Sequence, residues 1–237
     1  MHEKKFSILF PTRERPDLLT NILNSIVLHT HDIEAIEILI AYDDDDDQTE
    51  AVIRDGIYVE PHIPIQWVRT KRSLNFSRDY YTMLSKRARG RWLIIVNDDA
   101  EFETPNWDLM AERALQDQAP VIYGWVEDGL GASRMTDFND YTCFPILGRA
   151  GVEALGYVFP ERIPTWGADI FIRYLYGQVG RIVKVPIMIR HLSHHNGLRA
   201  QDHINKRIQD NQVPIDMNPT NEEINKLIQA ARRTAHV

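Results

Sequence analysis

The amino-acid sequence predicts an α/β protein with a mostly parallel central sheet and helices on both of its faces. Residues 6–10, 36–42 and 92–96 are mostly apolar runs without regular polar alternation, as in strands that are buried on both faces. Stretches with apolar residues at helical spacing separate these runs, which indicates repeated strand–helix–strand units. A chain of 237 residues is long enough for one domain with a substantial core.

The first half of the chain shows this alternation most clearly. Pro16 suits the first turn of a helix, and Gly90 suits the C-terminal cap of another. In order, we expect a strand over 6–10, a helix over 16–27, a strand over 36–42, a short helix over 48–54, a strand over 65–68, a helix over 76–89 and a strand over 92–96.

The second half is less regular, and glycines within residues 128–133 predict a surface loop there. Thr220 and Glu223 form a capping box that opens a last helix. The narrow apolar stripe of that helix favours packing on the body over self-association into a homo-oligomer. The other expected elements are a helix over 107–118, strands over 120–125 and 144–147, a short helix over 149–155, a helix that starts near Trp166, a strand over 181–189 and a helix over 201–209.

Composition excludes several classes of protein. The chain is 43% hydrophobic and 26% charged, as in ordinary globular proteins, and it has no run near the ~18 apolar residues that a membrane helix needs. The formal net charge of -7 argues against broad nucleic-acid binding. Cys143 is the only cysteine, so no internal disulfide is possible. With no apolar leader before the first strand, we expect a reducing, cytoplasmic location.

Charged residues follow three of the expected strands. Asp98 and Asp99 follow residues 92–96, five aspartates (43–47) follow the second strand, and Arg13 and Arg15 follow the first. Open α/β sheets bind ligands outside the carboxyl ends of their strands, and carboxylates suit a divalent cation that carries phosphates. The alternatives are a solvated turn around Asp98 and a flexible loop over the five acids.

These segments resemble family 2 glycosyltransferases, which have the GT-A fold. The family's first strand ends in a Pro-Thr-x-x-Arg-Pro-like turn, matched by residues 11–16, and its second strand ends in an acidic loop. A helix that opens with Asn-x-x-x-Arg follows, matched by Asn75 to Asp79, and then an Ala-x-Gly turn at 88–90. The family's Asp-x-Asp motif is matched by residues 97–99, although Asn97 stands where the family often has aspartate.

The resemblance implies a nucleotide-sugar site that binds Mn²⁺ or Mg²⁺, with a UDP-sugar as the expected donor. Asp99 would be the metal ligand, and Asp43 or Asp44 would accept the imide N–H of uracil. The remaining contacts to nucleotide, sugar or phosphate would come from Pro11, Thr12, Arg13, Arg15, Arg78, Asn97 and Asp98. For Arg78, the alternative is a surface ion pair with Asp79 or Glu101.

Two later segments add candidates for chemistry. Asp169, at the start of a helical run, matches the family's catalytic base, although it could instead cap its helix. His191 is the first choice and His194 the second for an additional ligand to the donor's metal. The alternative is that both are loop histidines that contact backbone, and their spacing does not fit a structural zinc site.

The expected function is therefore metal-dependent, inverting transfer of a sugar to an acceptor hydroxyl. Residues 1–103 would bind the donor, residues 104–198 the acceptor, and residues 199–237 would form a helical tail. The acceptor could be a carbohydrate, a protein, a small molecule or a modified nucleobase. A nucleotidyltransferase is an alternative, but residues 11–16 contain no glycine for a phosphate loop. A non-catalytic nucleotide- or sugar-binding module is the other.

Overall fold

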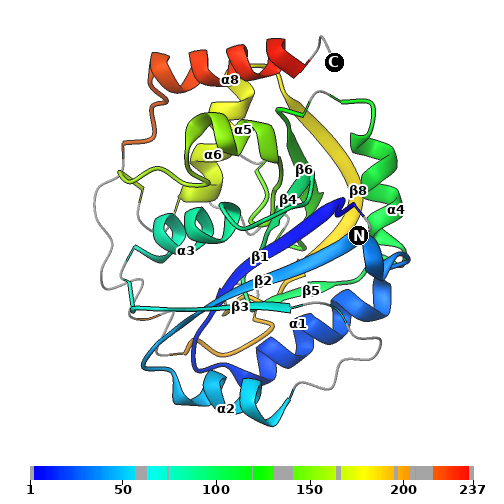
Figure 1. Cartoon of the computed structure of the whole chain (residues 1–237), viewed down its shortest axis with the longest axis vertical. Helices are drawn as coiled ribbons and strands as arrows, with labels where there is room; N and C mark the ends of the chain where they lie inside the picture. Colours follow the sequence, from blue (N-terminus) through cyan, green and yellow to red (C-terminus); the bar gives the residue numbers. More distant parts are fainter. Residues whose placement is uncertain are drawn as a thin grey trace.

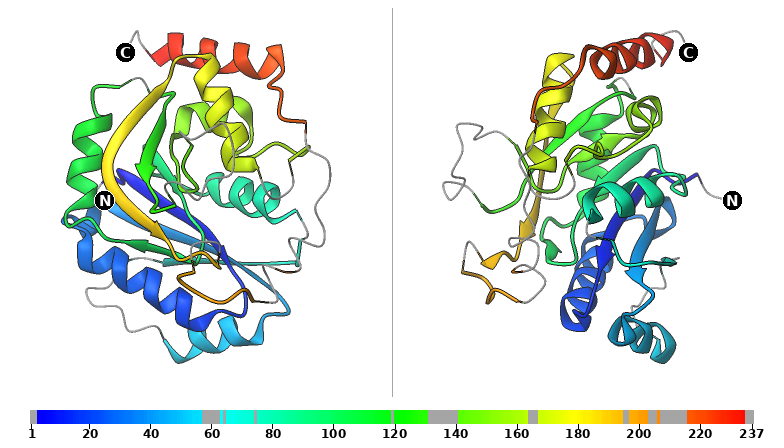
Figure 2. Two further views of the ribbon diagram at one scale, coloured as in Figure 1. Left: turned by 180° about the vertical axis from the view of Figure 1, so that it is seen from behind. Right: turned by 90° about the vertical axis from the view of Figure 1, so that its left-hand side faces the viewer.

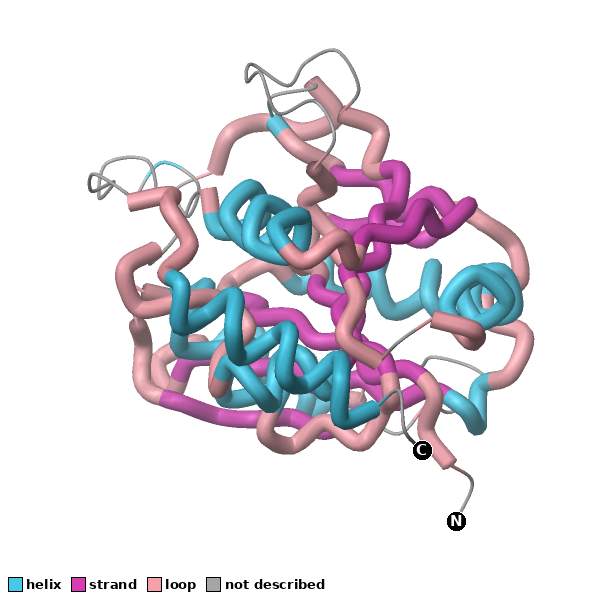
Figure 3. Tube along the Cα trace, turned by 90° about the horizontal axis from the view of Figure 1, so that it is seen from above, coloured by secondary structure: helices cyan, strands magenta, loops and turns pink. Residues whose placement is uncertain are grey.

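One sheet organises the part of the chain that the computed structural model describes, which comprises residues 3–56, 63, 65–73, 75–118, 120–130, 141–163, 167–194, 197–202, 206 and 216–234. Its eight strands lie in the order β3-β2-β1-β4-β7-β6-β8-β5. Helices lie on both sides of the strands (Figures 1 and 3). The predicted α/β class with a mostly parallel sheet is confirmed.

The first four strands along the chain are parallel to one another and adjacent in the sheet. They are β1 (Phe6–Thr12), β2 (Ile36–Asp43), β3 (Ile65–Thr70) and β4 (Trp92–Ile95). The register between β1 and β2 runs from Phe6 opposite Ile36 to Thr12 opposite Tyr42, so both strands end at the same edge. The polar residues that follow them therefore meet there.

The other four strands make the sheet mixed. They are β5 (Ala100–Phe102), β6 (Tyr123–Glu127), β7 (Ile146–Gly148) and β8 (Ile182–His191). β7 is antiparallel to β4 and β6, whereas β6 and β8 are parallel. The short strand β5, which the sequence did not predict, pairs with β8 and sets Ala100 opposite His191. This pairing brings the late histidine beside the acids that follow β4.

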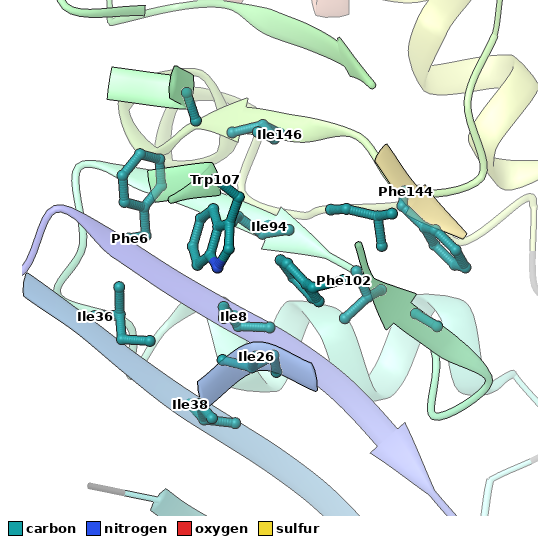
Figure 4. Packing of buried hydrophobic residues seen from close by; sticks show 14 of the residues in the cluster. Phe6, Ile8, Ile26, Ile36, Ile38, Ile94, Phe102, Trp107, Phe144 and Ile146 are labelled. Carbon is teal, nitrogen blue, oxygen red and sulfur yellow. The ribbon is translucent and has the colours of Figure 1, made fainter. Parts of the chain in front are cut away.

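The helices form two layers against the sheet (Figure 2). One apolar cluster joins α1 (Pro16–His29) and α4 (Trp107–Leu115) to one face, and its aromatic centre includes Phe6, Phe102 and Trp107 (Figure 4). A second cluster joins the opposite face to α3 (Phe76–Ser85), α5 (Arg149–Leu155), α6 (Ala168–Gln178) and α8 (Asn221–Thr234). Burial on both faces explains the continuous apolar runs of the central strands. The remaining helical elements are η1 (Ile33–Ala35) and α2 (Asp47–Asp55).

Gly90 does not cap a helix, so that prediction was wrong. α3 ends at Ser85, five residues earlier. A Cβ at Gly90 would lie 2.5 Å from the backbone nitrogen of Ser7, and the Gly90 N–H donates to Ser7 Oγ at 2.8 Å. Glycine is therefore required because the chain passes directly against β1 as it enters β4.

Several other boundaries differ from the predictions. The strand expected over 120–125 is β6, which begins at Tyr123, and the helix expected over 107–118 ends at Leu115. Trp166, the loop beyond residue 130 and most of the expected 201–209 helix lie outside the described residues.

The last helix packs against the body. Glu223 accepts from Thr220 N at 2.7 Å, and Glu223 N donates to Thr220 Oγ1 at 3.2 Å, which confirms the capping box. In Figure 1, α8 lies over α5 and α6. Leu227 is fully buried, and Ala231 nearly so, in the cluster with these helices. The stripe is thus used for packing, as the first of the two interpretations predicts. Among the described helices, none is long and apolar enough to cross a membrane.

Candidate functional site

Asp98 and Asp99 lie in the tight turn between β4 and β5, at the edge where β1 and β2 also end. Both acids are buried. Thr12 Oγ1 donates to Asp98 Oδ2 at 3.0 Å, and Arg15 Nη1 donates to Asp98 Oδ1 at 2.8 Å. The solvated-turn alternative is therefore wrong, and the turn after β1 does meet the acids after β4.

The turn after β1 also forms hydrogen bonds with the loop after β2. Arg13 Nη1 donates to Asp43 Oδ2 at 2.9 Å and to Asp45 Oδ1 at 2.5 Å. Glu14 has a left-handed φ of 52°, which residues other than glycine rarely adopt. Its backbone N–H donates to Asp46 Oδ2 at 3.0 Å. Asp46 also accepts from Thr49 N at 3.0 Å and so caps α2.

The five-aspartate loop therefore has two kinds of residue. Asp43 and Asp46 are buried and hydrogen-bonded, so the flexible-loop alternative is wrong for them. Asp44, Asp45 and Asp47 are exposed, as that alternative predicts. Like charges can share this loop because its two buried members have separate donors.

The side chain of Asp43, rather than that of Asp44, faces the other residues of the site. Its Oδ1 accepts from the Tyr80 hydroxyl and its Oδ2 from Arg13. Burial raises the pKa of Asp43, and these two donors offset part of that rise. The Asp44 side chain is exposed, although its backbone N–H donates to Thr70 O at 2.7 Å.

Asn97 is held by a tyrosine of α3. The Tyr81 hydroxyl lies 2.6 Å from Asn97 Oδ1 and 2.5 Å from Val96 O. This contact fixes the backbone just before Asp98, so Asn97 holds the turn in shape.

Asp99 lies between a histidine and an arginine. Its Oδ2 accepts from Arg199 Nη2 at 2.7 Å, and its Oδ1 lies 3.3 Å from His191 Nε2. Burial would raise the pKa of Asp99, but the adjacent His191 and the guanidinium groups outweigh it and hold this pKa low. Burial also disfavours charged His191, yet the Asp99 carboxylate raises the histidine's pKa above its ordinary value. The pKa of Asp98 is raised, by burial and by its neighbour Asp99.

The donor set at Asp99 fits one divalent cation in part. Asp99 Oδ1 is buried and accepts no well-directed hydrogen bond from the described residues. Two ligands at about 2.1–2.2 Å and at right angles would be ~3 Å apart, close to the 3.3 Å between this oxygen and His191 Nε2. In the described part of the chain, no three His, Cys, Asp or Glu side chains converge on one point, so His194 does not complete the set. Phosphate or water oxygens would have to supply the rest.

Asp169 is the second residue of α6, after Gly167 at the N-cap. Its Oδ1 accepts from Ile170 N at 2.9 Å, and the Cys143 thiol is a further hydrogen-bond partner. Burial raises the pKa of Asp169, and the charge of His191 is close enough to offset part of the rise. A carboxylate with a raised pKa near His191 is suited to accept a proton.

Arg78 does not join this cluster. Its Nε donates to Asp79 Oδ1 at 2.5 Å and its Nη1 to Glu161 Oε1 at 3.0 Å. Of the two interpretations, these contacts favour the surface ion pair, with Asp79 as expected and Glu161 in place of Glu101. The guanidinium lines an open pocket between α3 and the segment that carries Tyr157 and Glu161.

Four residues of the site escaped the sequence analysis: Tyr80, Tyr81, Arg199 and Asp202. The tyrosines are adjacent on the helix that the Asn75 motif opens, and their hydroxyls reach Asp43 and Asn97. Arg199 and Asp202 lie just beyond the histidine cluster, and their charges in that loop were the available signal.

Comparison with known proteins agrees with this geometry. No curated protein matches the chain. Among solved structures, S. aureus TarS 1–349 in complex with UDP has a TM-score of 0.62 at 16% identity, over 78% of this chain and 60% of that one. The same protein in complex with UDP-GlcNAc gives 0.61 at 16% identity, over 86% and 64%. The present chain thus spans less than two thirds of the TarS fragment.

A mannosyltransferase from Pyrobaculum calidifontis, in complex with GDP-Man and Mn²⁺, has a TM-score of 0.64 at 15% identity, over 100% of this chain and 76% of that one. At such identities these likenesses concern the fold, which they show to be GT-A. The sequence profile of glycosyl transferase family 2 matches residues 7–141, which is more than half of the chain. The chain belongs to glycosyl transferase family 2.

Proposed function

We propose that this protein is a metal-dependent, inverting glycosyltransferase that moves a sugar from a nucleotide-diphosphate donor, preferably a UDP-sugar, to an acceptor hydroxyl. The observation that carries the proposal is the pair of Asp99 and His191. A buried carboxylate oxygen without a directed hydrogen bond faces an imidazole nitrogen at 3.3 Å, beside the ends of β1 and β2. Such a pair is suited to bind a cation together with a diphosphate.

The donor would lie across the carboxyl ends of β1, β2 and β4. Asp43 would accept the imide N–H of the base, with Pro11 and Thr12 along the same wall. Arg13 and Arg15 stand at the end of β1 with guanidinium groups that suit phosphate oxygens. The structural neighbours' complexes with UDP, UDP-GlcNAc and GDP-Man support a nucleotide-sugar donor here.

Asp99 and His191 would hold Mn²⁺ or Mg²⁺. When bound, the cation would offset the negative charge that grows on the nucleoside-diphosphate leaving group. Asp98, which Thr12 and Arg15 hold, would keep the turn and its neighbour Asp99 in place. The Mn²⁺ in the Pyrobaculum mannosyltransferase complex supports this assignment.

Asp169 would be the general base in the acceptor half, residues 104–198. In one displacement, the acceptor oxygen bonds to the anomeric carbon as the bond from that carbon to the diphosphate oxygen breaks. The proton of the acceptor hydroxyl passes to the Asp169 carboxylate, and the configuration at the anomeric carbon inverts. The raised pKa of Asp169 supports this role, because a base whose pKa is nearer neutrality takes the proton more readily.

The test is a panel of nucleoside diphosphates and their sugars, with Mn²⁺ or with a chelator. We expect UDP and a UDP-sugar to raise the melting temperature only with Mn²⁺, since a ligand at 100 times its Kd stabilises by about 2.7 kcal/mol. Release of UDP from the sugar would then separate an enzyme from a binding module. If no nucleotide stabilises the protein with or without metal, the proposal fails.

A further inference from the structure

The segment after β8 turns back onto the acids of the site. Arg199 Nη2 donates to Asp99 Oδ2 at 2.7 Å, its Nη1 lies 3.2 Å from Asp202 Oδ2, and its Nε donates to Leu192 O at 2.7 Å. Only 13% of the Arg199 side chain is exposed. An arginine thus occupies one oxygen of the residue that we assign to the metal.

Asp202 links Arg199 to Arg15. Arg15 grips it with two bonds, from Nε at 2.8 Å and from Nη2 at 2.9 Å, while Arg15 Nη1 holds Asp98. The charges therefore alternate along one chain of contacts, which runs Asp98, Arg15, Asp202, Arg199, Asp99. We call residues 197–202 the strap, because they cross from the end of β8 to the turn after β1.

Arg199 and Asp202 contact the site through ion pairs. Leu198, the one large apolar residue of the strap, is 48% exposed and so gains little from burial. Each ion pair is also one that a metal–diphosphate ligand would compete for. A cation would compete with Arg199 for Asp99, and phosphate oxygens would compete with Asp202 for both arginines.

The charge balance permits such an exchange. Three carboxylates against two guanidinium groups give the cluster a net charge of about -1 with neutral histidine. A divalent cation adds two positive charges, and the diphosphate of a nucleotide sugar adds about two negative ones, so the total is conserved. The same arginines can then serve two sets of partners without leaving a buried charge uncompensated.

We propose that Arg199 is a donor-diphosphate ligand that rests on Asp99 until the metal and the nucleotide arrive, and that Asp202 holds the strap in that resting position. This inference rests on the proposed function and extends it to residues beyond the match to the family profile at 7–141. In the resting state Arg199 competes with the cation; in the bound state it contacts phosphate oxygens.

The test compares Arg199→Gln with Arg190→Gln, which loses the same charge. Arg190 lies next to His191 on β8, but its guanidinium binds Glu103 at 2.5 and 2.8 Å. Calorimetry would measure the affinity for Mn²⁺ alone and then for UDP in saturating Mn²⁺. We expect Arg199→Gln to bind Mn²⁺ about tenfold more tightly and UDP about tenfold more weakly, as one charged hydrogen bond is removed. Arg190→Gln should match the parent in both.

Opposite signs of the two changes distinguish this role from a structural one, which would weaken both affinities or neither. Unchanged or weaker Mn²⁺ binding by Arg199→Gln would overturn the resting position on Asp99, and undiminished UDP binding would overturn the diphosphate contact. Asp202→Asn, which loosens the strap but keeps Arg199, should leave UDP affinity equal or higher; a loss would count against the proposal. Failure of the proposed function would look different, because the parent protein itself would bind neither Mn²⁺ nor UDP.

Discussion

Two buried carboxylates, Asp99 at the strand ends and Glu223 in the first turn of α8, are both held by an arginine, yet they differ in how many hydrogen bonds they accept. Glu223 accepts from Arg162 at 2.9 and 2.7 Å, from Thr220 N at 2.7 Å, from Thr220 Oγ1 at 3.0 Å and from the Tyr157 hydroxyl. Both of its oxygens are satisfied. Asp99 has a strong donor on Oδ2, but its Oδ1 accepts no directed hydrogen bond from the described residues.

The difference separates a structural acid from a functional one. Burying a charge is costly unless donors replace the lost water, and the five bonds of Glu223 meet that need within the fold. A buried carboxylate oxygen that accepts no directed hydrogen bond leaves part of the cost of burial for a ligand to offset. We therefore assign Glu223 to stability and Asp99 to binding.

The largest expected effect concerns Asp169, a partly buried acid that we assign, like Asp99, to function. Asp169→Asn keeps the size and an oxygen for Ile170 N but cannot take the acceptor's proton. We expect turnover to fall by roughly 10²–10⁴-fold, with UDP and Mn²⁺ affinity nearly unchanged. Turnover and calorimetry on the same variant would check this. Near-parental turnover would leave Asp169 as a residue that only caps α6.

The next effect is on stability, at Glu223. Glu223→Ala leaves Arg162 without its buried partner, so we expect unfolding to become easier by about 3–5 kcal/mol. Glu222→Ala is the matched control, since Glu222 is 76% exposed, pairs only with Lys226 among the described residues, and should cost about 0.5 kcal/mol or less. Denaturant melts would measure both. UDP affinity of the folded Glu223 variant should equal the parent's, and a large loss would undo the division.

A smaller effect is expected at Asp43. Asp43→Asn presents an amide to the base and weakens a charge-assisted contact, so UDP should bind about 10–100-fold more weakly, with its metal requirement intact. The exposed neighbour provides the control, because Asp44→Asn makes the same change one residue away. Calorimetry with UDP would decide the matter. Equal affinities for both variants would place base recognition elsewhere.

The last effect is a dependence of stability on pH. The donors around Glu223 lower its pKa to about 2, below its ordinary value of 4.5, although burial opposes them. The folded state therefore favours the charged form, and this stabilisation is complete above about pH 4.5 and is lost as the pH falls towards 2. Melting temperatures of the parent and of Glu223→Gln should differ at pH 7 and converge near pH 2–3. A gap that widens in acid would contradict the assignment.

The parallel strands and their charged ends could be predicted because each signal is local. An apolar run that stops at an acid, as Val96 does before Asn97 and Asp98, marks both the strand and its end. The contact of Thr12 with Asp98 then follows from parallel pairing, which sets the ends of β1 and β4 at one edge. The burial of Asp46 could not be predicted, because its cap on α2 depends on the fold of the loop.

The remainder depends on contacts between distant parts of the chain. Arg199 reaches Asp99 across 100 residues, and Arg15 reaches Asp202 across 187. These contacts are set by the pairing of β5 with β8, and the three residues of β5 are too few to show a period. The proximity of His191 to Asp99 was expected from the resemblance to the family. The arginine and aspartate that accompany it were not.

The most direct test of the central claim is calorimetry of UDP, with Mn²⁺ and with a chelator, on Asp99→Asn and Glu223→Gln. Each variant replaces one buried carboxylate by an amide of the same size. We predict that Asp99→Asn binds UDP weakly and equally with or without Mn²⁺, because the cation has lost its carboxylate ligand. Glu223→Gln, studied at a temperature where it is folded, should keep the parent's metal-dependent affinity. Undiminished metal-dependent binding by Asp99→Asn would contradict the assignment of Asp99 to the metal.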